Sequence, residues 1–288
     1  MGLRSWLRRI LPVEFQPPKD LPRRLLAASG YFRFRTWLAN RGVTIPEAHL
    51  YQPLFSPWEG AADFVEHDRA IRKHTLVSRD RCHVLWRTLQ QSLRLPGDLV
   101  ECGVFRGGTA LLEARTLAAA EGTTRRPLHL FDSFQGMPEE VSSEESFRPG
   151  HLGRTSPAHV RQLLADYPFV QMHVGFIPDT FAELKLEQVA WAHVDLDIYE
   201  AIRGAIAFLY PRLVPGGFLI FDDYGFPSCP GARRAVDEAF ADRREVPLCL
   251  PTGQCLVVKL PASDLGSPVK PPTCTAAYGP LAECSSMS

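Results

Sequence analysis

The amino-acid sequence predicts a doubly wound α/β fold, in which helices cover both faces of a mostly parallel sheet. Short apolar runs alternate with helical segments from about residue 98 to residue 241, and this order of elements builds such a sheet. The turn Pro251-Thr252-Gly253 then separates the last two apolar runs. These two runs should form a hairpin, so we expect the final strand to be antiparallel to the rest.

The expected strands are short apolar runs, and in the expected helices apolar residues recur with helical spacing. The strands are Asp98–Glu101, Leu128–Phe131, Val170–Val174, Ala190–Val194, Phe218–Phe221, Val246–Leu250 and Cys255–Leu260. The helices are Val77–Leu93, Thr109–Ala120, Pro157–Asp166, Asp179–Leu184, Tyr199–Leu209 and Gly231–Ala241.

The composition divides the chain into three parts. Residues 1–70 are rich in Arg, Pro and aromatic residues and should form an extension of helices and loops. Its first residues, MGLRSWLRRILP, set apolar side chains against arginines, which suits a docking helix or a helix on a membrane surface. Residues 71–261 should form the main domain. Residues 262–288 are rich in Pro, Ser and Thr, and we expect them to be disordered.

Charge and cysteine content exclude several classes of protein. Lys plus Arg and Asp plus Glu each number 32, whereas nucleic-acid-binding proteins usually carry a basic excess. No apolar run is long enough to predict stable insertion into a membrane. The 7 cysteines contain no CxxC pair, which argues against a zinc site or a disulfide framework and favours reduced thiols in a cytoplasmic protein. A homo-oligomer is compatible with this composition.

Two acidic pairs follow two of the expected strands. Asp195 and Asp197 follow the apolar run in WAHVDLDIY, and Asp222 and Asp223 follow the apolar run in PGGFLIFDDY. If these strands share a parallel sheet, their carboxylates converge and resist ionisation. A hard divalent cation such as Mg²⁺ prefers oxygen ligands and would relieve this conflict. Alternatively, Asp222 and Asp223 accept backbone N–H groups in a loop, and Asp197 caps the helix that starts near Tyr199.

A glycine-rich turn joins the first strand to the next helix in LVECGVFRGGT. Gly103, Gly107 and Gly108 have the spacing GxxxGG, whereas dinucleotide-binding turns have GxGxxG. Glu101, just before the first glycine, would repel a pyrophosphate but suit the amine or sulfonium of S-adenosylmethionine. A nicotinamide cofactor on the same fold, and glycines that serve only close packing, are the alternatives.

Two further loops contain candidate ligand-binding residues. Asp132 and Ser133 follow the second strand, where an acid commonly accepts hydrogen bonds from ribose hydroxyls; Asp132 could instead cap the following turn. Asp179 and Thr180 end the string GFIPDT. Asp179 could cap a helix or accept a hydrogen bond from an adenine amino group.

With these segments in place, the chain resembles the macrocin O-methyltransferase family from about Thr75 to Leu260. The motifs that carry the resemblance are VECGVFRGGT, FDSFQGMPE, GFIPDT, HVDLDIYE, LYPRLVPGG, DDYG and GARRAVDEAF. The resemblance implies a Rossmann-like class I methyltransferase sheet and an enzyme that uses S-adenosylmethionine and Mg²⁺. It also implies a small glycosylated natural product, as in antibiotic biosynthesis, that is methylated on a sugar hydroxyl.

The resemblance also assigns roles to residues. It implies Asp195, Asp222 and Asp223 as metal ligands and Asp197 as the general base. The expected donor-binding residues are Glu101, Gly103, Gly107, Gly108, Thr109, Asp132, Ser133, Asp179, Thr180 and Asp195. Two alternatives stay open besides a nicotinamide-dependent oxidoreductase: a catechol or other phenol as acceptor, and a noncatalytic accessory protein that kept the fold.

Overall fold

The computed structural model describes residue 40 and residues 56–121, 126–139, 147–182 and 184–262. The chain divides into two compact units, residues 1–57 and 58–288, and the elements described below lie almost entirely in the second. The expectations for the first twelve residues, for most of the N-terminal extension and for the tail after residue 262 fall outside the described residues. None of the described helices is long and apolar enough to cross a membrane.

The centre of the second unit is a seven-stranded sheet with the order β3-β2-β1-β4-β5-β7-β6. Neighbours among β1 to β5 are parallel, β7 is antiparallel to β5 and β6 is antiparallel to β7. The doubly wound fold and its antiparallel last strand are therefore confirmed. The strands are β1 Asp98–Cys102, β2 Leu128–Asp132, β3 Val170–Val174, β4 Val189–Val194, β5 Leu213–Phe221, β6 Leu248–Cys249 and β7 Cys255–Val258.

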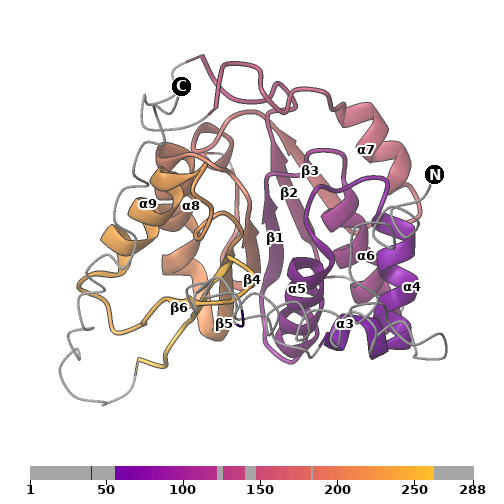
Figure 1. Ribbon diagram of the computed structural model, residues 1–288, viewed down its shortest axis with the longest axis horizontal. Helices are drawn as coiled ribbons and strands as arrows, with labels where there is room; N and C mark the ends of the chain where they lie inside the picture. The colour runs from indigo at the N-terminus through magenta and orange to yellow at the C-terminus, as the bar shows by residue number, and fades with distance from the viewer. Residues whose placement is uncertain (1–39, 41–55, 122–125, 140–146, 183, 263–288) are drawn as a thin grey trace. The chain divides into compact units, whose positions relative to one another are not determined.

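Helices lie on both faces of the sheet (Figure 1). They are α3 Pro57–Gly60, α4 Ala62–Ile71, α5 Arg79–Ser92, α6 Gly108–Glu121, α7 Pro157–Leu163, α8 Tyr199–Leu209 and α9 Pro230–Phe240. Two short 3₁₀ helices, η3 Asp179–Phe181 and η4 Tyr210–Arg212, complete the set. The helix expected over Asp179–Leu184 is reduced to η3, because so short a segment forms too few hydrogen bonds to offset the cost of starting an α-helix.

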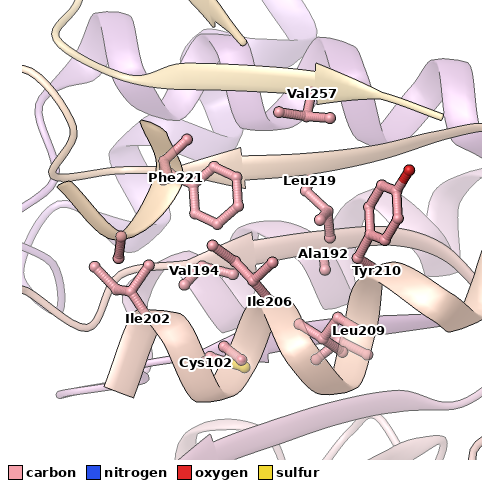
Figure 2. Close-up of a cluster of buried hydrophobic side chains, with 14 of the residues drawn as sticks. Cys102, Ala192, Val194, Ile202, Ile206, Leu209, Tyr210, Leu219, Phe221 and Val257 are labelled. Carbon is pink, nitrogen blue, oxygen red and sulfur yellow. The ribbon is translucent and has the colours of Figure 1, made fainter. Parts of the chain in front are cut away.

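Each face of the sheet has its own hydrophobic core. On one face α8 and α9 pack against β1, β4 and β5, with Ile202, Ile206 and Leu209 of α8 lying over the strands (Figure 2). On the other face Leu85 of α5 and Leu112 of α6 pack against the sheet. Central strands covered on both sides read as largely apolar runs, and the fully buried β4 is apolar apart from His193.

The strand order places one point of the sheet at a crevice. The chain winds outward from β1 to β3 and then returns to β4 on the other side of β1. Helices that leave β1 and β4 therefore diverge to opposite faces, and ligands of such sheets bind outside the carboxyl ends of the strands at this reversal.

Candidate active site

The carboxyl ends of β1, β4 and β5 lie level with one another. The N–H group of Asp195 donates to the Cys102 carbonyl at 2.8 Å, and that of Asp222 donates to the Val194 carbonyl at 2.9 Å. Each acid therefore follows directly on a paired strand position. The sheet register alone brings residues separated by more than 25 positions in the sequence into one site.

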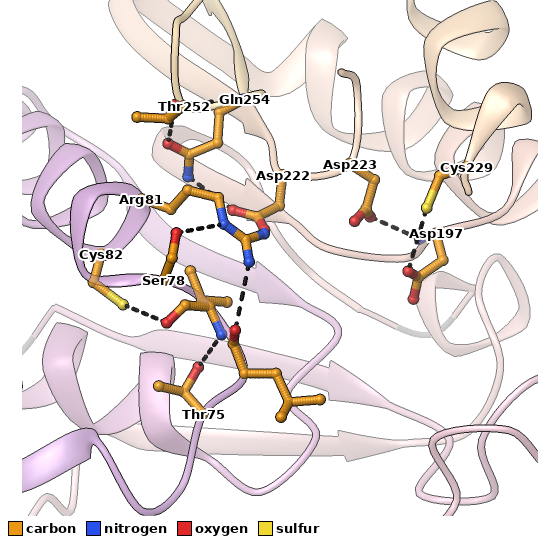
Figure 3. A network of polar contacts seen from close by, with 12 residues as sticks. Thr75, Ser78, Arg81, Cys82, Asp197, Asp222, Asp223, Cys229, Thr252 and Gln254 are labelled. Atoms are coloured by element: carbon orange, nitrogen blue, oxygen red, sulfur yellow. Dashed lines mark hydrogen bonds and ion pairs between the residues drawn. The ribbon is translucent and has the colours of Figure 1, made fainter. Parts of the chain in front are cut away.

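The four acids lie in two adjacent groups. Potential ligand atoms of His193, Asp195 and Asp222 lie within 4.8 Å of one another, and so do those of Asp197, Asp223 and Cys229. Because Asp222 and Asp223 are consecutive, the two groups adjoin (Figure 3).

Two of the four acids have pKa values raised by their surroundings. Burial, together with the charges of Asp222 and Asp223, raises the pKa of Asp195 well above its usual range. Burial and the neighbouring carboxylates of Asp197 and Asp222 do the same to the pKa of Asp223. Like charges in a dry site resist ionisation, so both carboxylates would be stabilised by an added cation.

Asp222 differs because it already has partners. Its Oδ1 accepts a hydrogen bond from Gln254 Nε2 at 2.8 Å and lies 3.4 Å from His193 Nε2, and its Oδ2 pairs with the Arg81 guanidinium (Figure 3). Burial favours the neutral acid, but His193, Arg81 and Gln254 outweigh it and lower the pKa of Asp222. The alternative in which Asp222 and Asp223 accept backbone N–H groups in a loop therefore does not describe the Asp222 side chain, although Asp223 does accept the Asp197 N–H group.

His193 and Glu101 form a buried layer behind the acids. His193 Nδ1 lies 3.3 Å from Glu101 Oε1, and neither side chain has exposed surface. Burial opposes protonation of His193, but Asp222 and Glu101 outweigh it and raise its pKa to about 10. Glu113 adjoins this pair at 3.8 Å from His193 Nδ1, and burial raises its pKa well above the usual range. His193 lies inside a strand, which predicts only a packed core residue, and a lone arginine such as Arg81 carries no motif, so neither is predicted as a site residue.

Asp197 has an unusual backbone conformation for a residue with a side chain, with φ of 60°. Its N–H group donates to Asp223 Oδ2 at 2.9 Å, and the Cys229 thiol donates to its Oδ1 at 3.7 Å. The residue that caps α8 is Ile198, which makes no side-chain capping hydrogen bond. Asp197 is therefore not the cap of α8, and its side chain lies at the wall of a cavity.

That cavity has a volume of about 440 Å³ and lies beside the acid cluster. Five of the expected donor-binding residues line it, together with Asp197, Asp223 and Arg81. Those five are Gly103, Thr109, Asp132, Ser133 and Asp195. Apolar side chains cover other parts of the wall, among them Leu76, Met137, Phe147, Phe176 and Phe226.

Different contacts exclude a side chain at each of the three glycines in the loop after β1. A Cβ on Gly103 would lie 1.8 Å from the carbonyl oxygen of Asp195, so the loop can approach β4 only without a side chain. Gly107 and Gly108 do not line the cavity: a Cβ there would meet Val160 of α7 and the backbone before α5, respectively. Close packing, rather than contact with a ligand, therefore explains the glycines at positions 107 and 108.

Asp132 fixes the loop geometry. Its Oδ2 accepts the N–H groups of Val104 and Phe105, each at 2.8 Å, and its Oδ1 accepts that of Phe134 at 2.6 Å. It therefore caps both the glycine loop and the next turn. A carboxylate has about four lone-pair positions, so Oδ1 keeps capacity for one further donor from the cavity side.

Besides Gly107 and Gly108, three further expected donor-binding residues lie away from the cavity. Glu101 is fully buried because it shares a face of β1 with Leu99, under α5 and α6, where it meets His193. Asp179 is exposed at the start of η3, and Pro178, not Asp179, caps that helix, so the capping role expected for Asp179 is not seen. Thr180 packs its methyl group beside Gly175. These placements correct the expectation that all three face the donor.

The donor atoms of the site suit a divalent cation. Among the residues that the structure describes, none donates a hydrogen bond to the Asp195 side chain, so its oxygens are open to a metal. Carboxylate oxygens are the ligands that Mg²⁺ prefers. Burial and neighbouring carboxylates raise the pKa values of Asp195 and Asp223, and a bound cation would favour the ionised form of both. The residues present therefore fit the ion.

Comparisons with known proteins agree with this geometry. The family model described as Macrocin-O-methyltransferase (TylF) matches residues 56–250. Mycinamicin III 3''-O-methyltransferase of Micromonospora griseorubida is 32% identical over 189 residues, which cover 60% of this chain and 72% of that protein. A Streptomyces olivaceus enzyme, 8-demethyl-8-(2,3-dimethoxy-alpha-L-rhamnosyl)-tetracenomycin-C 4'-O-methyltransferase, is 35% identical over 172 residues, which cover 55% of this chain and 66% of that protein.

A solved structure is also similar. The O-methyltransferase NovP aligns with a TM-score of 0.58 and 28% identity, over 65% of this chain and 83% of that chain. The calicheamicin methyltransferase CalS11, with a TM-score of 0.56 and 20% identity over 69% of this chain and 93% of that chain, shares the fold. These matches are to methyltransferases, which decides against a nicotinamide-dependent oxidoreductase.

Proposed function

Because the chain belongs to the macrocin O-methyltransferase family and is an S-adenosylmethionine-dependent O-methyltransferase, we propose that it methylates a sugar hydroxyl of a glycosylated natural product with the help of Mg²⁺. The observation that carries the proposal is the meeting of Asp195, Asp197 and Asp223 at the wall of the cavity that Gly103 also lines. A donor-binding loop and a base therefore face one space.

The acceptor class is supported by relatives and by the cavity wall. The name of the tetracenomycin enzyme places methylation at a 4' position of a rhamnosyl compound. In this chain the wall combines acids that can accept hydrogen bonds from hydroxyl groups with apolar side chains such as Phe147 and Phe226. A glycosylated aglycone presents this combination of polar and apolar surface.

Asp195, Asp222 and Asp223 would hold the cation. When bound, Mg²⁺ supplies Lewis-acid polarisation of an acceptor hydroxyl. The chain's own contribution to proton transfer is Asp197, whose backbone Asp223 holds at 2.9 Å. Burial raises the pKa of the Cys229 thiol, so the thiol stays protonated and donates to Asp197 without competing for the proton.

These groups account for the proton and for both bonds that change in the methyl transfer. Asp197 accepts the hydroxyl proton while the acceptor oxygen forms a bond to the methyl carbon. The carbon–sulfur bond of the donor breaks, and its electron pair remains on sulfur. Gly103 lets the donor loop approach the end of β4, and this positioning brings the reacting atoms together.

The experiment is a methyl-transfer assay on a panel of glycosylated natural products and simple catechols, with Mg²⁺ or with EDTA. We expect turnover only of glycosylated acceptors and only with Mg²⁺. Replacing the base in Asp197→Asn should lower kcat by about 10²–10⁴-fold and leave the affinity for S-adenosylhomocysteine unchanged. Asp166→Asn, at an exposed position after α7, is the matched control.

A different result of this assay would contradict each part of the proposal. Full turnover in EDTA would show that the reaction needs no divalent metal. Turnover of catechols alone would replace the acceptor class. A kcat of Asp197→Asn within threefold of the wild-type value would remove Asp197 as the base.

A further inference from the structure

Arg81 joins two distant parts of the chain at the acid cluster. It lies on α5, 141 positions before Asp222 in sequence, and its guanidinium pairs with Asp222 Oδ2 (Figure 3). The Arg81 side chain is 13% exposed and that of Asp222 is 0% exposed. Arg81 therefore lies between the buried carboxylate and the cavity, which it also lines.

Other contacts hold the guanidinium in this place. Arg81 Nε donates to Ser78 Oγ at 3.1 Å, and the guanidinium carbon lies 4.9 Å from the centre of the Phe226 ring. Burial opposes its charge, but Asp222, Asp195 and Asp223 outweigh burial and raise the pKa of Arg81. A single guanidinium thus responds to the same three carboxylates that would hold the divalent cation.

Asp222 has little capacity for two cations at once. Gln254 and His193 face its Oδ1 and Arg81 occupies Oδ2, which leaves about one lone-pair position of the four. A metal that used it would share one oxygen with the guanidinium. The divalent cation and the guanidinium would repel each other across this one carboxylate. Even at the dielectric constant of water, this repulsion weakens metal binding by roughly tenfold or more.

We propose that Arg81 is a built-in competitor of the divalent cation at Asp222, which neutralises this carboxylate when no metal is bound and releases it when a metal enters. The proposal rests on the metal assignment of the proposed function and goes beyond it. In the metal-free protein Arg81 holds the Asp222 carboxylate in position, and the same contact weakens metal binding.

The test measures Mn²⁺ binding by electron paramagnetic resonance in the absence of donor and acceptor. The variants are Arg81→Gln and Arg81→Leu, with Arg81→Lys to retain the charge. Arg87→Leu removes one positive charge from an exposed position on the same helix and is the matched control. We expect Arg81→Gln and Arg81→Leu to bind Mn²⁺ roughly tenfold or more tightly than wild type, with Arg87→Leu unchanged and Arg81→Lys close to wild type.

Stability gives a second readout. In EDTA, Arg81→Leu should unfold at a lower temperature than wild type, because Asp222 loses one of its two cationic partners and keeps only His193. Added Mn²⁺ should raise the Tm of Arg81→Leu by more than it raises the wild-type Tm. The reason is that a ligand bound more tightly by the folded protein stabilises the folded protein more. Equal or weaker Mn²⁺ binding by the neutral variants would overturn the proposal, because a bracing role for Arg81 predicts that result.

Two outcomes separate this inference from the proposed function. If no protein in the set binds Mn²⁺ saturably, both the metal assignment and the competition fail. If all bind with equal affinity, only the competition fails. Wild-type crystals grown in EDTA and in Mn²⁺ test the same point without a substitution: the contact between Arg81 and Asp222 should be lost in the loaded crystal, and an intact contact beside a bound ion would overturn the proposal.

Discussion

Replacing Gly103 with alanine tests whether the donor loop and the acid cluster meet as closely as described. A Cβ at this position would lie 1.8 Å from the carbonyl oxygen of Asp195 and 2.8 Å from its carbonyl carbon. The atom in the way belongs to the backbone, so no side-chain rotation can relieve the collision. The loop must move away from the end of β4 by more than about 1 Å to reach an ordinary packing distance.

Two costs add in this variant. The φ of Gly103 is +92°, and a left-handed backbone costs an alanine about 1–2 kcal/mol. Forcing extra atoms into a packed site costs about 1–3 kcal/mol more. We therefore expect Gly103→Ala to lose about 2–5 kcal/mol of unfolding free energy, which is a decrease in Tm of roughly 5–15 °C for a domain of this size.

Gly150 is the matched control because it separates the two costs. Its φ is +71°, but a Cβ there would meet nothing within 4 Å. Gly150→Ala should therefore lose only the backbone cost, about 1–2 kcal/mol. Urea unfolding measures both variants, and calorimetry with S-adenosylhomocysteine should show at least about tenfold weaker binding for Gly103→Ala alone. Equal stability losses with unchanged donor affinity would refute the close approach.

Two further substitutions probe the loop and the pH dependence of the fold. Asp132→Ala leaves three backbone N–H groups without their acceptor and should lower the unfolding free energy by about 2–4 kcal/mol; a loss below about 0.5 kcal/mol in urea would contradict its capping role. Burial of Glu245 favours its neutral form, but hydrogen bonds from the Tyr210 hydroxyl and the Leu260 N–H outweigh it and lower its pKa. Its carboxylate therefore adds stability above the unfolded-state pKa of about 4.3, and this contribution is lost as the pH falls through the lower folded-state pKa. Thermal unfolding from pH 7 to pH 3 should show a shallower acid loss for Glu245→Gln than for wild type, and identical slopes would count against this linkage.

The sequence predicted the central strands well because of how they are buried. Strands covered on both faces, such as β4, are largely apolar and stand out as nearly continuous runs; in β4 only His193 is polar. The start of β5 was predicted at Phe218 instead of Leu213, because Pro215, Gly216 and Gly217 interrupt the run. The edge strand β6 shrank to Leu248–Cys249, since it has a partner on one side only.

The acids of the site were predictable because each lies within three residues after the end of a strand. Arg81 was not, because a single arginine on a helix carries no motif, and its contact with Asp222 depends on how α5 packs over the sheet. The position of Glu101 could have been predicted better. Strand alternation places it on the same face as Leu99, and the register of β1 with β4 sets it opposite His193. A buried acid beside a histidine suggests an internal pair.

The most direct measurement is anomalous diffraction from crystals of the protein soaked with Mn²⁺ and S-adenosylhomocysteine. The metal assignment predicts one strong peak about 2.0–2.6 Å from carboxylate oxygens of Asp195, Asp222 and Asp223, with the donor product beside Gly103. A peak bound only by surface acids, or a filled donor cavity with no peak at these three residues, would contradict it.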